Sequence, residues 1–152
     1  MSRSLLLLVL LAGTALLSLG QAPVTVTNLG YDPCSDPDQV QTLAVNEGAA
    51  MGNTELVPVF GSTRIWLCSG RLQGGAAGEL WPLFGDGTAC ASNTDYLAVH
   101  LVTAANEPPL ILDGAGGNGT FKRSAPARAF CIYRNVSMTL VGHIRFVQAV
   151  QN

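Results

Sequence analysis

The sequence predicts an all-β fold assembled from short strands. Apolar and β-branched runs recur along the chain, separated by Gly, Pro and Asn, and none keeps helical spacing over its length. Charged residues make up only 12% of the chain, so small and neutral polar side chains must form much of the surface. The net charge is −2 and no basic run is present, which argues against nucleic acid as a partner.

Residues 1–22 have the pattern of a secretory signal peptide. Arg3 precedes an apolar run from Leu5 to Leu19, and small residues follow at Gly20 and Ala22. The run is shorter than the roughly 20 apolar residues that span a bilayer. We therefore expect the segment to be removed, leaving a secreted or cell-surface protein without a membrane span.

Residues 23–62 are expected to hold an N-terminal strand, an acidic loop and a cap. Val24 to Asn28 alternates Val and Thr, which predicts a strand. The Asp- and Pro-rich residues 32–38 predict a loop. Residues 39–47 fit a short helix or a strand equally well, and residues 56–60 predict a further strand.

Residues 63–152 contain the remaining predicted strands. The first three lie at 64–68, 80–84 and 96–103, and Pro108 and Pro109 then break the pattern. From Val136 onward the apolar residues fall on even positions, as they would in one long half-buried strand. The phases of these runs place eight residues in one core: Leu110, Leu112, Phe130, Ile132, Met138, Leu140, Ile144 and Phe146.

Two architectures agree with this spacing. Short strands at about 20–30 residues per coil are typical of a β-solenoid. Strands recurring every 8–12 residues or so are also typical of an antiparallel β-sandwich, and periodicity alone does not separate the two.

Four segments near the C-terminus carry a resemblance to a known family: Ile111–Gly116, Phe130–Ile132, Asn135–Gly142 and Ile144–Val147. They resemble turns and strands of the right-handed parallel β-helix in pectin-lyase-like and polymorphic outer-membrane-protein-like domains, best over residues 108–151. The resemblance implies a short parallel β-helix with an irregular N-terminal cap. Its coils would occupy residues 63–152, either as a complete β-helix or as a truncated one. An antiparallel β-sandwich is the alternative.

The cysteines are Cys34, Cys68, Cys90 and Cys131. An even number behind a signal peptide predicts two disulfides, and three pairings are open. Cys34–Cys68 and Cys68–Cys90 are the leading pairs, while Cys131 is alternatively a buried free thiol. The spacing contains no CxxC, so a zinc site is not expected.

Acidic residues offer few sites for a metal. Asp32, Asp36 and Asp38 are weak candidates for calcium, since the loop lacks the spacing of an EF-hand, and we expect a solvated loop and no cofactor. Asp113 in Leu-Asp-Gly is expected to cap a turn.

No catalytic residue is assigned. Pectate lyases of the resembled family use an arginine with several strand-borne aspartates, and no such set accompanies Arg134 or Arg145. His100 and His143 lie in a strand and at a corner, and His100 is expected to face outward. Whether the chain is an enzyme stays open, with the residues favouring a non-enzymatic protein.

Other sequence features concern carbohydrate. Asn118 and Asn135 begin N-glycosylation sequons, which matter only in a glycosylating host. Trp66 and Trp81 are candidates for stacking on sugar rings, although the apolar neighbours of Trp66 favour a place in the core.

The leading hypothesis is a secreted or cell-surface structural or adhesive β-solenoid, with carbohydrate binding as an option and a polysaccharide or cell-surface component as partner. One alternative is a polysaccharide lyase or hydrolase of the pectin-lyase-like fold, including an inactive fragment. The other is a disulfide-stapled β-sandwich binding module. We also expect self-association through an open edge at residues 136–147, unless the strand at 24–28 covers that edge.

Overall fold

A computed structural model describes residues 24–26, 32–105, 107–113 and 121–151. The signal-peptide region and Asn118 lie outside these residues. Two three-residue 3-10 helices are present, η1 (Pro33–Ser35) and η2 (Thr88–Cys90). The strands are β1 (Val24–Val26), β2 (Gln41–Val57), β3 (Arg64–Gly74), β4 (Gly78–Asp86), β5 (Ser92–Tyr96), β6 (His100–Val102), β7 (Leu110–Asp113), β8 (Lys122–Arg123) and β9 (Ala129–Gln151). Within the described residues, no helix is long and apolar enough to cross a membrane.

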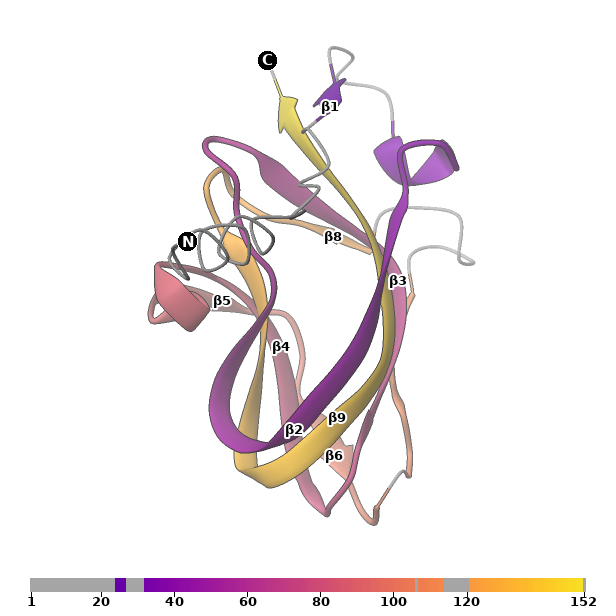
Figure 1. Ribbon diagram of the computed structural model, residues 1–152, viewed down its shortest axis with the longest axis vertical. Helices are drawn as coiled ribbons and strands as arrows, with labels where there is room; N and C mark the ends of the chain where they lie inside the picture. The colour runs from indigo at the N-terminus through magenta and orange to yellow at the C-terminus, as the bar shows by residue number, and fades with distance from the viewer. Residues whose placement is uncertain (1–23, 27–31, 106, 114–120, 152) are drawn as a thin grey trace, which may run out of the picture.

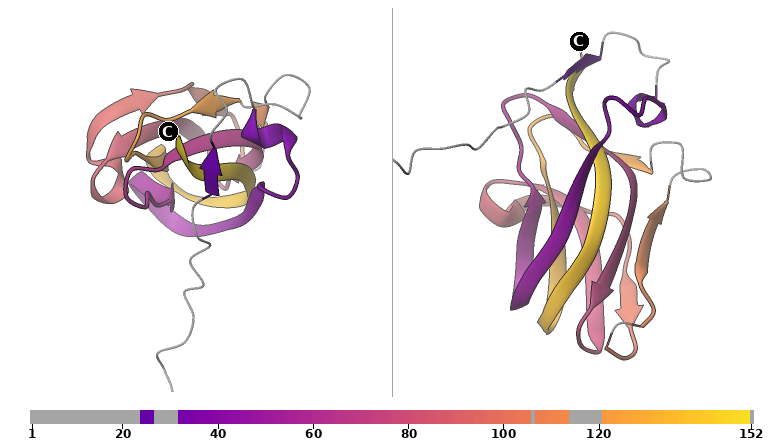
Figure 2. Two further views of the ribbon diagram at one scale, coloured as in Figure 1. Left: turned by 90° about the horizontal axis from the view of Figure 1, so that it is seen from above. Right: turned by 45° about the vertical axis from the view of Figure 1, so that its right-hand side comes forward.

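All nine strands belong to one curled sheet that forms a half-barrel (Figures 1 and 2). Every pair of strands is antiparallel except β1 with the end of β9. The expected parallel β-helix is therefore wrong, and so is the resemblance on which it depended. The arrangement agrees with the antiparallel alternative. The sequence did not separate the two folds, because parallel coils and antiparallel strands share the same alternation of side chains.

The long strand β9 organises the sheet. On one side β2 pairs with it from Gln41, opposite Phe146, to Val57, opposite Phe130. On the other side β3 pairs with residues 140–149 of β9, and β4 pairs with residues 129–134. The strand therefore passes from one half of the sheet to the other, and Figure 1 shows β2 and β9 curving together through this corner.

The expected open edge at residues 136–147 is consequently in the interior of the sheet. Residues 140–146 have β2 on one side and β3 on the other, so this part of the run is not an open edge. The strand expected at 24–28 is present as Val24–Val26, and it pairs with Ala149–Gln151 at the end of β9. Residues 39–47, for which a helix and a strand were both open, contribute to β2.

A single large core fills the inside of the curl. It includes all eight residues expected from the phase of the sequence, so that prediction is confirmed. Burying these side chains contributes roughly 25 cal/mol for each Å² of apolar surface removed from water. Leu80 and Phe84 from β4 join Leu72 from β3, so the core connects both halves of the sheet.

Two disulfides hold peripheral segments to the sheet. Cys34–Cys68 fixes the η1 loop to β3, and Cys90–Cys131 fixes the η2 loop to β9. The first is one of the two pairs that we favoured, whereas the favoured Cys68–Cys90 pair is not formed. The option of a free thiol at Cys131 is wrong, because the curl of the sheet brings η2 over the outer side of β9.

Candidate functional site

The outer side of β4 and β9 carries a cluster of aromatic rings. Trp81 and Tyr133 are cross-strand partners, and their ring centroids lie 5.8 Å apart. Tyr96, from the neighbouring β5, places its ring 5.2 Å from Trp81 in an edge-to-face arrangement. Leu80 and Phe84 alternate with Trp81 along β4 and point into the core, so these rings lie on the opposite face.

Glu79 and Asn135 form the polar side of this aromatic cluster. Glu79 Oε2 accepts hydrogen bonds from Trp81 Nε1 at 3.1 Å and from Asn135 Nδ2 at 3.2 Å. The backbone N–H of Glu79 donates to Asn135 Oδ1 at 2.7 Å. These bonds fix the Trp81 ring and leave Glu79 Oε1 without a hydrogen bond to any other described residue.

Exposed apolar side chains continue the cluster along the β5–β6 edge. Tyr96 is 49% exposed, Val99 60% and Leu101 58%. Leu101 pairs with Glu79, which places it beside the polar side of the cluster. We call this surface, formed by Glu79, Trp81, Tyr96, Val99, Leu101, Tyr133 and Asn135, the aromatic face.

The phase of β6 differs from our expectation. Val102 is buried and His100 pairs with Leu80, a core residue, so His100 does not project from the outer face. Its Nε2 lies 2.8 Å from the carbonyl oxygen of Pro108, and Leu101 faces outward instead. The reason is the burial of Val102, which fixes the phase of this short strand.

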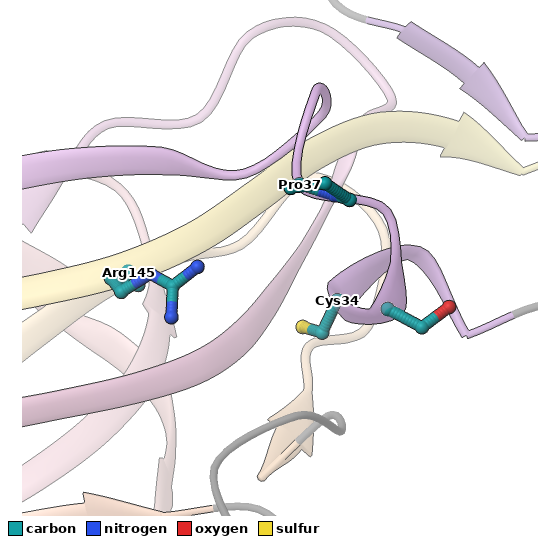
Figure 3. Close-up of a pocket in the computed structure, with 4 residues that line it drawn as sticks. Cys34, Pro37 and Arg145 are labelled. Carbon is teal, nitrogen blue, oxygen red and sulfur yellow. The ribbon is translucent and has the colours of Figure 1, made fainter.

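A hollow lies at the other half of the sheet, where β3 pairs with β9. A cavity of about 420 Å³ is lined by Cys34, Ser35, Pro37 and Arg145, and Figure 3 shows the Arg145 guanidinium extending from β9 toward the η1 loop. Arg145 lies between Thr42 of β2 and Ser69 of β3. The hollow is therefore bordered by one cation, Arg145, and by the hydroxyl-bearing Ser35.

The acidic candidates in the η1 loop organise its backbone. Asp32 Oδ1 accepts from the N–H of Cys34, and Asp36 Oδ1 accepts from the N–H of Asp38. Across residues 32–105, 107–113 and 121–151, no group of three or more His, Cys, Asp or Glu side chains could hold a metal ion. Asp113 ends β7, and the glycine-rich turn that we expected it to cap lies outside the described residues.

Other residues singled out from the sequence have structural surroundings. Trp66 is buried beside the Cys34–Cys68 disulfide, in agreement with a place in the core. The Asn135 side chain of the second sequon is engaged with Glu79 on both its oxygen and its nitrogen. Sequence analysis named Trp81 but missed Tyr96, Val99 and Leu101, whose common face depends on how β5 and β6 pair with β4.

Comparison with known proteins adds no family. No protein-family model matches the chain, and no curated protein matches it. The expected pectin-lyase-like relationship therefore has no support from sequence comparison either.

Proposed function

We propose that the chain is a non-enzymatic extracellular binding module, an antiparallel β fold stapled by two disulfides, that binds carbohydrate through the aromatic face. Two disulfides suit an oxidising compartment. The observation that carries the proposal is the exposure of Tyr96, Val99 and Leu101 beside the partly exposed Trp81. Contiguous exposed apolar surface marks binding sites in soluble proteins.

Carbohydrate suits the chemistry of this face. Aromatic rings provide flat apolar surface for the C–H face of a sugar ring, while their polar neighbours hydrogen-bond its hydroxyl groups. Glu79 Oε1 is an acceptor without a described partner, and Glu79 is held in place by Trp81 and Asn135. The site is therefore ordered before a ligand arrives, which reduces the entropic cost of binding.

The test uses the mature protein with neutral polysaccharides: insoluble cellulose and chitin, and soluble β-glucan and xylan. Sedimentation with the insoluble polymers and titration with the soluble ones measure binding. We expect at least one polymer to bind, and Tyr96→Ala to weaken its binding tenfold or more. Phe60→Ala is the matched control, because Phe60 is 48% exposed and lies between β2 and β3.

Two results would contradict the proposal. One is a lack of binding to all four polymers at millimolar sugar concentration. The other is an equal loss of binding in Tyr96→Ala and Phe60→Ala, which would mean that exposed aromatic area in general, and not the aromatic face, retains the polymer.

A further inference from the structure

Arg71, His143 and Arg145 lie together on the outer side of the other half of the sheet. Arg71 pairs with His143 across β3 and β9, and Arg145 follows His143 on the same side of β9. The core residues Leu72 and Ile144 alternate with them, so the three side chains point away from the core. Directly opposite residues of an antiparallel pair have Cβ atoms about 4.5–5.5 Å apart, and diagonal ones are about 7–8 Å apart. The long arginine side chains can therefore reach one ligand.

The two arginines of this group differ from others in the protein. Arg64 donates to the carbonyl oxygen of Ser124, Arg134 has hydrogen bonds inside the sheet, and Arg128 pairs with Asp86. Among the described residues, Arg71 and Arg145 have no hydrogen bond or ion pair. Two guanidinium groups on one face thus keep all their donors available, in a chain whose net charge is negative.

We propose that Arg71, His143 and Arg145 form a binding site for the sulfate or carboxylate groups of an acidic polysaccharide. A guanidinium presents a planar fork of donors that matches an oxyanion with two parallel hydrogen bonds. The Arg145 guanidinium lies at the hollow that Ser35 and Pro37 of the η1 loop also line (Figure 3). This inference does not depend on the aromatic face, which lies on the other half of the sheet.

A polymer suits this surface better than a free ion or a nucleic acid. The face is open, so a single ion would gain little from exposed charges, whereas a polyanion engages several groups at once. Ser69 and Thr42, which flank Arg145, offer hydroxyl groups to a sugar. Single-stranded nucleic acids stack on aromatic side chains, and the residues paired with Arg145 and His143 are Ser, Thr, Ala and Arg.

Carboxylates lie near the site on two sides, with Asp113 at the end of β7 and with Asp36 and Asp38 in the η1 loop, whose Ser35 and Pro37 line the hollow. Asp113 pairs with Ser69 and is exposed, two strands away from β9. A strand spacing of about 4.8 Å places it roughly 10 Å from the Arg145 backbone. At that separation, about one Debye length, salt weakens the effect of its charge, so Asp113 limits the site on the β7 side. On the loop side, the Asp36 carboxylate accepts hydrogen bonds from the N–H of Asp38 and from Gln39 Nε2.

The experiment measures binding of the mature protein to dextran sulfate, with unmodified dextran as the neutral probe. The Arg71→Gln/Arg145→Gln double variant should weaken binding to dextran sulfate at least tenfold. The matched control is Lys122→Gln/Arg128→Gln, which removes the same charge from other places and should retain binding within about twofold. Circular dichroism checks that both variants are folded.

Several outcomes would overturn the inference. Equal loss in the two double variants would mean that net charge alone governs retention. Absence of binding to dextran sulfate at low salt, or equal binding to unmodified dextran, would exclude the site. Competition by millimolar inorganic sulfate would indicate a site for a free anion, and equal competition by single-stranded DNA would indicate an unselective polyanion surface.

Discussion

Arg134 donates from Nη1 to the carbonyl oxygen of Gly48 at 2.9 Å, linking β9 to the bulged part of β2. The same nitrogen donates to the carbonyl oxygen of Met138 at 2.7 Å, and Nη2 donates to Thr54 Oγ1. Arg134 is only 1% exposed, and this burial lowers its pKa, while Glu47 acts in the opposite direction. One guanidinium therefore supplies hydrogen bonds at the corner where β9 passes from β3 to β4.

Replacing this guanidinium should destabilise the fold. In Arg134→Met the side chain keeps an unbranched apolar stem but donates nothing, so the buried carbonyl oxygen of Met138 loses its Arg134 donor. We expect the free energy of unfolding to fall by about 1–3 kcal/mol, measured by urea denaturation. Arg128→Met, which removes a partly exposed ion pair with Asp86, should change it by less than about 1 kcal/mol. Equal midpoints for Arg134→Met and wild type would show that the corner does not need these hydrogen bonds.

The disulfide pattern can be tested in unreduced protein. Peptide mapping by mass spectrometry should recover Cys34–Cys68 and Cys90–Cys131, with no Cys68–Cys90 peptide. The Cys90→Ala/Cys131→Ala variant removes the disulfide that joins two positions 41 residues apart in the sequence. For a loop of that length, the chain-entropy model predicts that the free energy of unfolding falls by about 4 kcal/mol. A variant as stable as the wild type under oxidising conditions would contradict this contribution.

Gly142 should tolerate no side chain. Its φ is +147°, and a Cβ there would lie 2.0 Å from the carbonyl oxygen of Arg71, so β3 and β9 would have to separate. Gly142→Ala should therefore cost about 1–3 kcal/mol or more, by analogy with overpacked cores. Gly48→Ala is the control, since a Cβ at Gly48 meets nothing within 4 Å. Thermal unfolding of both variants tests this prediction. Equal melting temperatures would mean that β3 and β9 do not approach each other this closely at Gly142.

The misassigned architecture has a specific cause in β9. Met138, Leu140, Ile144 and Phe146 alternate in the way required by a half-buried strand of any kind. The sequence does not show that residues 129–151 are one continuous strand, because Asn135 and Gly142 look like corners of a coil. In the structure Asn135 bonds to Glu79 and Gly142 allows close approach of β3, so both residues serve strand pairing.

The candidate surfaces were even less accessible to sequence reasoning. Trp81 and Tyr133 are 52 positions apart in the chain, and only the register of β4 against β9 makes them neighbours. Arg71 and His143 likewise meet through the register of β3 against β9. Residue type indicated that Trp81 is able to stack on a sugar ring, whereas strand pairing determined which groups surround it.

By itself, the sequence determined the all-β class, the presence of disulfides and the buried face of each C-terminal run. These properties depend on composition and on the alternation of side chains, which is local to each strand. The tertiary structure decided which strands are neighbours, whether they are parallel, which cysteines pair and which outer residues gather. Parallel and antiparallel partners can bury the same alternating residues, so strand pairing depends on contacts between segments distant in sequence, such as Leu80 with Arg134 and Leu72 with Gly142.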